Sequence, residues 1–178
     1  MPRLDADATI VAFGDSLTFG TGADEGNSYP AVLEQLIGRK VIGAGVPGEV
    51  TSAGLERLPE VLDEYKPQLL ILCLGGNDLL RKMDEGALAA NLRAMIRIAR
   101  DRGIGVVLVG VPRPALLTSV PEMFAQIAGE TKVPLEADVQ KDVLFDQSLK
   151  SDPIHPNAKG YRKIAEALAK LLRSSGAV

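Results

Sequence analysis

The stretch LLILCL at residues 69–74 is apolar at every position and is followed at once by the turn sequence GGND at residues 75–78. A parallel strand that is covered by helices on both faces has no solvent-facing side, so its apolar residues are continuous rather than alternating. The stretch therefore predicts a buried strand of a parallel sheet. Other short apolar runs predict four more strands, at residues 8–13, 40–44, 106–111 and 143–145.

Helical patterns lie between these predicted strands. The apolar residues of segment 88–99 recur with the period of an α-helix. Strands that alternate with helices predict an α/β fold, in which helices cover both faces of a parallel sheet. The sequence shows no repeat or linker, so residues 1–178 are expected to form a single domain. Further helices are expected at residues 29–37, 52–65, 122–128 and from about residue 157 onward.

Composition narrows the functional classes. The net charge of −3 argues against a nucleic-acid-binding surface, which needs a basic face. No apolar stretch approaches the roughly 18 residues of a membrane-spanning helix, so no integral membrane segment is expected. The N-terminal residues MPRLD lack the apolar core of a signal peptide. This is consistent with a cytoplasmic chain, or with an exported chain whose signal peptide has been removed.

Candidate site residues follow four of the five predicted strands. Ser16 follows the first, Gly48 the second, Asn77 the third, and the pair Asp152 and His155 follows the fifth. Ligands of open parallel sheets bind at the carboxyl ends of the strands. We therefore expect these residues to meet at one edge of the sheet.

An ester-cleaving serine needs a base, a group that orients the base, and donors for the tetrahedral oxyanion. His155 is the only histidine of the chain, and Asp152 precedes it by three residues, a spacing that places two side chains on one face of a helical turn. The Ser16 N–H, the Gly48 N–H and the Asn77 amide are the candidate oxyanion donors. Each residue alone has an ordinary explanation, as a helix cap, a turn or a surface residue. Their convergence favours catalysis.

The segments GDSL (14–17), Gly48, GGND (75–78) and DPIH (152–155) resemble the four sequence blocks of the SGNH (GDSL) hydrolases. The similarity is greatest to small bacterial arylesterases and to multifunctional thioesterase I/lysophospholipase L enzymes. It implies a flavodoxin-like three-layer α/β/α sandwich with a five-stranded parallel sheet, and a periplasmic location if a signal peptide was removed. It also implies a catalytic triad of Ser16, His155 and Asp152. The oxyanion hole that it implies is formed by Ser16, Gly48 and Asn77.

Many relatives carry Asn at the position of Gly43, and we expect this difference to affect loop rigidity more than activity. The predicted function is hydrolysis of carboxylic esters through an acyl-enzyme, with aryl esters, short-to-medium acyl esters, acyl thioesters and lysophospholipids as candidate substrates. A carbohydrate acetylesterase of the same family and a non-enzymatic flavodoxin-like binding module remain alternatives. Three leucines are candidates for an acyl groove, or else pack under the loops: Leu79, Leu116 and Leu117.

Other sites are not expected. The sequence GAGVPG at residues 43–48 matches a dinucleotide-binding pattern, but it follows the second strand, and Pro47 lacks a phosphate-facing N–H. Cys73 lies within an apolar strand, where a thiol is inert. With one histidine and one cysteine, the chain offers few metal ligands besides carboxylates, so neither a metal nor another cofactor is expected. The expected partner is a small ester substrate, and the oligomeric state stays open.

Overall fold

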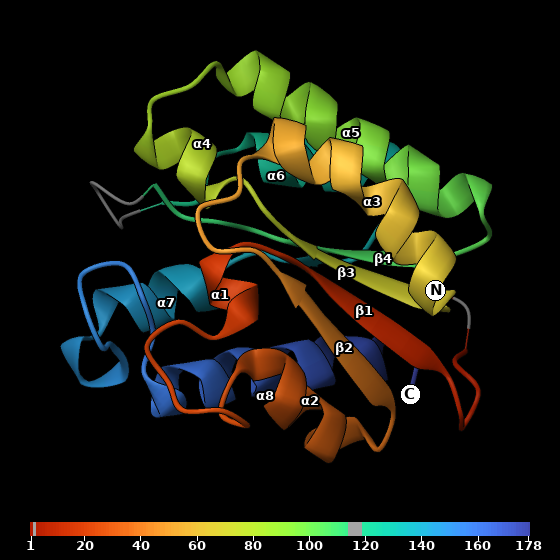
Figure 1. Cartoon of the computed structure of the whole chain (residues 1–178), viewed down its shortest axis with the longest axis horizontal. Coiled ribbons are helices and arrows are strands. Elements are labelled where there is room, and N and C mark those ends of the chain that lie inside the picture. The colour runs from red at the N-terminus through yellow and green to blue at the C-terminus, as the bar shows by residue number, and fades with distance from the viewer. Residues whose placement is uncertain (2, 114–118) are drawn as a thin grey trace.

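The computed structural model describes residues 1, 3–113 and 119–178. Within these residues, five parallel strands form one sheet in the order β2-β1-β3-β4-β5 (Figure 1). This confirms the predicted α/β fold with a five-stranded parallel sheet. The strands are β1 (Thr9–Gly14), β2 (Lys40–Gly45), β3 (Leu69–Cys73), β4 (Gly105–Val109) and β5 (Leu135–Glu136).

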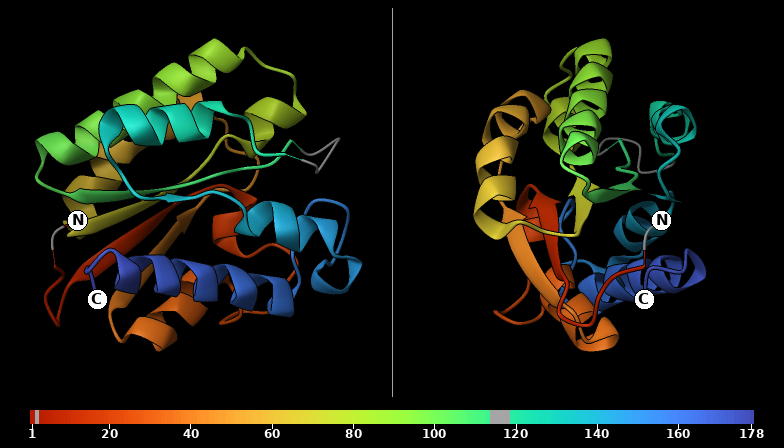
Figure 2. Two further views of the ribbon diagram at one scale, coloured as in Figure 1. Left: turned by 180° about the vertical axis from the view of Figure 1, so that it is seen from behind. Right: turned by 90° about the vertical axis from the view of Figure 1, so that its right-hand side faces the viewer.

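Helices cover both faces of this sheet, as the views in Figure 2 show. One face is covered by α2 (Tyr29–Ile37), α7 (Val139–Phe145) and α8 (Ala158–Ser174). The other is covered by α3 (Thr51–Tyr65), α5 (Glu85–Asp101) and α6 (Met123–Thr131). The remaining short helices are α1 (Ser16–Phe19), α4 (Gly76–Leu80) and the 3₁₀ helix η1 (Gln147–Leu149). In the described part of the chain, no helix is both long and apolar enough to cross a membrane.

The continuous apolar sequence of β3 reflects its central place between the two helical layers. Leu69, Ile71 and Cys73 pack in the core on the α2–α8 side, whereas Leu70 and Leu72 pack on the α3–α5 side. All five residues are almost completely buried. The absence of a polar face in the sequence is thus explained by helices on both sides.

The fifth strand was predicted at the wrong place. Residues 143–145 belong to α7. The fifth strand, β5, is instead Leu135–Glu136, which pairs with the last two residues of β4. Val139 and Val143 lie one helical turn apart and are both buried, whereas Phe145 is 70% exposed. A three-residue apolar run is too short to distinguish the helical period from that of a strand. Asp152 and His155 therefore follow α7 and η1 rather than a strand.

The ends of three strands meet where β1 passes into α1. Gly14 pairs with Gly45 of β2 on one side and with Cys73 of β3 on the other. The α1 helix lies directly against Gly45: a Cβ atom there would clash with the Phe19 backbone nitrogen and would lie 2.6 Å from the Asp15 carbonyl oxygen. The absence of a side chain at Gly45 is therefore required for the position of α1.

Replacing Gly45 with alanine should lower the free energy of unfolding by about 3 kcal/mol, because the neighbouring atoms are backbone atoms that cannot rotate away. Gly43→Ala is the matched control, since a Cβ atom there meets nothing closer than the Pro30 side chain at 3.6 Å. Its effect should stay below about 1 kcal/mol. Urea unfolding of both variants measures the difference, and equal losses would show that the close approach at Gly45 is unimportant.

Candidate active site

Ser16 lies at the carboxyl end of β1, as the first residue of α1. Asp15 caps this helix, because its Oδ1 atom accepts a hydrogen bond of 3.1 Å from the Leu17 N–H. Capping by a carboxylate satisfies a backbone donor that the short helix leaves free. The tight turn from β1 into α1 thus fixes Ser16 at the sheet edge.

His155 connects Ser16 to Asp152. The His155 Nε2 atom lies 3.0 Å from the Ser16 Oγ atom, and Nδ1 lies 2.7 Å from Asp152 Oδ2. The expected helical turn is not what brings Asp152 and His155 together, because the chain bends here without forming a helix. Instead, Asp152 Oδ1 accepts hydrogen bonds from the backbone N–H groups of Ile154 and His155, at 2.8 and 2.9 Å.

These contacts determine the charge on Asp152. Partial burial raises its pKa, but the hydrogen bonds from the His155 ring and from the Ile154 and His155 backbone together outweigh burial and lower the pKa below its usual value. An ionised Asp152 keeps the proton of the imidazole on Nδ1. The Nε2 atom is then free to accept the hydroxyl proton of Ser16.

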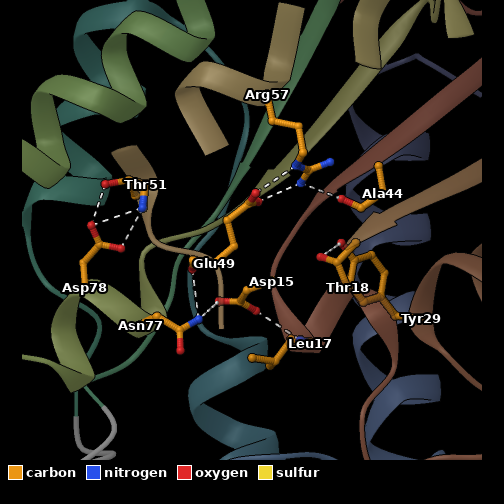
Figure 3. Close-up of polar contacts among 10 residues, drawn as sticks. All are labelled: Asp15, Leu17, Thr18, Tyr29, Ala44, Glu49, Thr51, Arg57, Asn77 and Asp78. Atoms are coloured by element: carbon orange, nitrogen blue, oxygen red, sulfur yellow. Dashed lines mark hydrogen bonds and ion pairs between the residues drawn. The ribbon is translucent and has the colours of Figure 1, made fainter. Parts of the chain in front are cut away.

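Two of the three predicted oxyanion donors are Gly48, in the loop after β2, and the Asn77 amide, which α4 places against that loop. Gly48 has the left-handed φ of +80°, and its carbonyl accepts a hydrogen bond of 2.9 Å from Arg81. The Asn77 Nδ2 atom lies 3.0 Å from the Glu49 carbonyl and 3.2 Å from Asp15 Oδ2 (Figure 3). The side-chain amide of Asn77 thus has two acceptors within the protein. An oxyanion bound there would share one of the Asn77 amide protons with its present acceptor.

A pocket opens beside Ser16, Asn77 and His155. Its walls are mostly apolar. Leu79 is placed elsewhere, in the core between the sheet and α3–α5, while its neighbour Leu80 lines the pocket and is 47% exposed. Leu116 and Leu117 lie outside the described residues. The apolar wall residues are Leu17, Leu80, Val111, Pro112, Leu144 and Ile154.

Comparisons with known proteins agree with this geometry. Residues 12–163 match the GDSL-like Lipase/Acylhydrolase family. The chain belongs to this family. It is a serine ester hydrolase, as the resemblance of the sequence blocks indicated.

Named relatives of this GDSL hydrolase are esterases and thioesterases. Esterase TesA of Pseudomonas aeruginosa is 30% identical, over 89% of this chain and 84% of that protein. Thioesterase 1/protease 1/lysophospholipase L1 of Escherichia coli is 29% identical, over 96% and 86%. Among solved structures, AlinE4, an SGNH-hydrolase family esterase, aligns with a TM-score of 0.75 at 32% identity, covering 97% of this chain and 98% of that one.

The buried acidic group of Asp15, at the site of this GDSL hydrolase, has an unusual pKa that was not predicted from the sequence. Burial raises its pKa from 3.8 to about 6, even though the Leu17 N–H and His155 lower it, and the nearby Glu49 raises it further. The signal was present in the sequence, because an acid between a buried strand and the nucleophile has little access to solvent. Cys73 shows the same effect: burial raises the pKa of its thiol to about 12, so the thiol stays protonated.

The raised pKa of Asp15 makes stability depend on pH. Its ionisation is easier in the unfolded chain, so its contribution to stability is fully present below about pH 4 and is lost as pH rises through about 6. A shift of about two pKa units corresponds to about 3 kcal/mol. The free energy of unfolding of the wild type, relative to that of Asp15→Asn, should therefore fall by most of this amount between pH 4 and pH 7.

Urea unfolding of both proteins at several pH values measures this difference. Any constant effect of the asparagine, such as its hydrogen bonding to Asn77, is independent of pH and cancels. Parallel pH dependences for the two proteins would show that Asp15 titrates normally.

Proposed function

We propose that Ser16, His155 and Asp152 are the catalytic triad of this ester hydrolase. The observation that carries the proposal is the continuous contact from Ser16 Oγ through the imidazole to the Asp152 carboxylate, at 3.0 and 2.7 Å. Ser16 Oγ attacks the carbonyl carbon of the ester while His155 Nε2 accepts its proton. His155 then gives this proton to the leaving alcohol or thiol as the bond to it breaks, which leaves an acyl-enzyme.

Water completes the reaction by the same route. His155 Nε2 removes a proton from a water molecule that attacks the acyl carbonyl, and then returns the proton to Ser16 Oγ as the acid leaves. In both halves, Asp152 stabilises the imidazolium that forms transiently. The negative oxygen of each tetrahedral intermediate is proposed to lie among the N–H groups of Ser16 and Gly48 and the amide of Asn77.

The pocket beside Ser16 favours an apolar acyl group as the part of the substrate that is recognised. The side chains of Leu80, Leu144 and Ile154 have no group that could hydrogen-bond to a sugar. These apolar walls disfavour the carbohydrate acetylesterase alternative. Aryl esters, acyl thioesters and lysophospholipids share an acyl carbonyl and differ in the leaving group. We therefore propose short-to-medium acyl chains as substrates, with Leu80 rather than Leu79 as the contact from α4.

Ser16→Ala should reduce ester turnover by roughly a million-fold, because no other group replaces the nucleophile. Ser52→Ala, at an exposed position of α3, is the matched control and should keep wild-type activity. A reactive organophosphate should add one phosphoryl group to the wild type, on the peptide that contains Ser16, and none to Ser16→Ala. If Ser16→Ala kept more than roughly 3% of the wild-type kcat, Ser16 would be excluded as the nucleophile.

The acyl pocket should be visible in chain-length dependence. Each methylene that leaves water is worth about 0.8 kcal/mol, so kcat/KM for p-nitrophenyl esters should rise by up to about fourfold per methylene until the pocket is filled. Leu80→Ser should flatten this rise and leave acetyl esters nearly unchanged. Met83→Ser is the control, since Met83 is similarly exposed, at 42%, but does not line the pocket. An equal loss at every chain length would place Leu80 outside the acyl contact.

A further inference from the structure

Arg57 of α3 and Glu49 form an ion pair beneath the proposed oxyanion loop. Both guanidinium edge nitrogens are used: Nε lies 2.8 Å from Glu49 Oε1, and Nη2 lies 2.7 Å from Oε2 (Figure 3). The Glu49 side chain is only 5% exposed. A buried carboxylate requires such a partner, because burial of an unpaired charge is costly.

Arg57 also holds the other end of the same loop. Its Nη2 atom donates a hydrogen bond of 3.1 Å to the carbonyl of Ala44, and the guanidinium lies 4.1 Å from the centre of the Phe13 ring. Ala44 and Glu49 flank residues 45–48, so one side chain connects both ends of this loop. Arginine suits this role, because its planar group presents several donors in a fixed arrangement and stacks on aromatic rings.

We call the contacts of Arg57 with Glu49 and Ala44 the Arg57 clamp. Glu49 links this clamp to both proposed oxyanion donors. It follows Gly48 directly in the chain, and its carbonyl accepts a hydrogen bond of 3.0 Å from the Asn77 amide. Gly48, which directly precedes Glu49, has little stiffness of its own, since glycine adopts many backbone conformations. The ion pair with Arg57 is therefore a buried contact on which the positions of the Gly48 N–H and the Asn77 amide both depend, beside the Arg81 and Asp15 contacts described above.

We propose that Arg57 and Glu49 are positioning residues of the oxyanion hole: without touching the substrate, they hold the Gly48 N–H and the Asn77 amide where the transition state needs them. This inference rests on the proposed oxyanion hole. Oxyanion donors act at 2.7–3.1 Å, and losing one costs about 10²–10³ in kcat. A displacement of about 1 Å is enough to cost about 100-fold. Loosening the clamp should therefore lower kcat and leave KM almost unchanged.

The test compares Arg57→Met with Arg93→Met. Arg93 forms an equivalent two-point ion pair with Glu130, at 2.7 and 3.1 Å, on the exposed surface between α5 and α6. With p-nitrophenyl butyrate, Arg57→Met should lower kcat by about 10- to 100-fold with KM within about twofold. Arg93→Met should match the wild type. Arg57→Lys, which keeps the charge but not the two-point geometry, should recover only part of the loss.

A second readout separates positioning from simple stabilisation. An alkyl trifluoromethyl ketone forms a hemiketal oxyanion on the nucleophile, so its inhibition constant should weaken in Arg57→Met by the same factor as kcat/KM falls. Urea unfolding shows whether the variant is folded under assay conditions. If Arg57→Met is unfolded, Arg57→Lys and Glu49→Gln are used for the same measurements, with the same expected pattern at smaller size.

Two results would overturn the inference: a lower unfolding midpoint with wild-type kcat and inhibition constant, or a loss confined to KM. Either would make the ion pair purely structural. These failures differ from failure of the proposed function, which Ser16→Ala decides. An inactive Ser16→Ala beside a fully active Arg57→Met would remove the positioning role alone.

Discussion

The buried carboxyl group of Asp15 joins the three strand ends on which the proposed site is built. Its Oδ1 atom caps α1 after β1, and its Oδ2 atom accepts from Asn77, which follows β3. Asn77 in turn donates to the carbonyl of Glu49, in the loop after β2. Asp15, Asn77 and Glu49 thus form one connected network beside the proposed nucleophile, in which no element can move without changing the hydrogen bonds of the other two (Figure 3).

The buried acids of this edge are stabilised in three different ways. Glu49 is neutralised by Arg57. Asp78 accepts hydrogen bonds from the Thr51 N–H at 2.9 Å and the Thr51 hydroxyl at 2.5 Å, and so ties α4 to the first residue of α3. Asp15 has hydrogen-bond donors but no arginine or lysine, and burial accordingly raises its pKa. The network around the nucleophile is therefore built at a cost in stability near neutral pH, as is common for functional sites.

The parts of the fold that sequence patterns predicted are those with long or unambiguous signals. The five-residue buried strand β3 and the stripe of α5 are examples, and the polar residues after β1, β2 and β3 follow from them. The two-residue β5 has no pattern of its own, because only its pairing with β4 makes it a strand. The adjacent leucines of the short α4 could not be told apart, since the rotation of about 100° between successive helical residues decides that Leu79 is buried and that Leu80 lines the pocket.

The contacts that sequence could not predict are those between distant side chains. In the sequence, Arg57 is an ordinary polar position of an amphipathic helix. Its spacing from Glu49 and Ala44 does not show that its side chain contacts both of them. The sequence likewise does not show the arrangement that brings Ser16 and His155 together.

His155 is brought to Ser16 by the position of α8, which packs in the core on the α2–α8 side of the sheet. The side-chain oxygen of Asn157 caps α8. Its side-chain amide nitrogen donates hydrogen bonds of 3.0 and 3.2 Å to the carbonyls of Ser148 and Lys150, which holds the preceding segment against the helix. One turn into α8, the Tyr161 hydroxyl donates a hydrogen bond of 2.7 Å to the carbonyl of Thr21, just beyond α1. His155 thus lies just before the N-terminal end of α8, which Tyr161 ties to the segment that follows Ser16 and α1. The contact between Tyr161 and Thr21 thus contributes to the separation of Ser16 and His155, and the ion pair of Arg57 and Glu49 is proposed to position the oxyanion side.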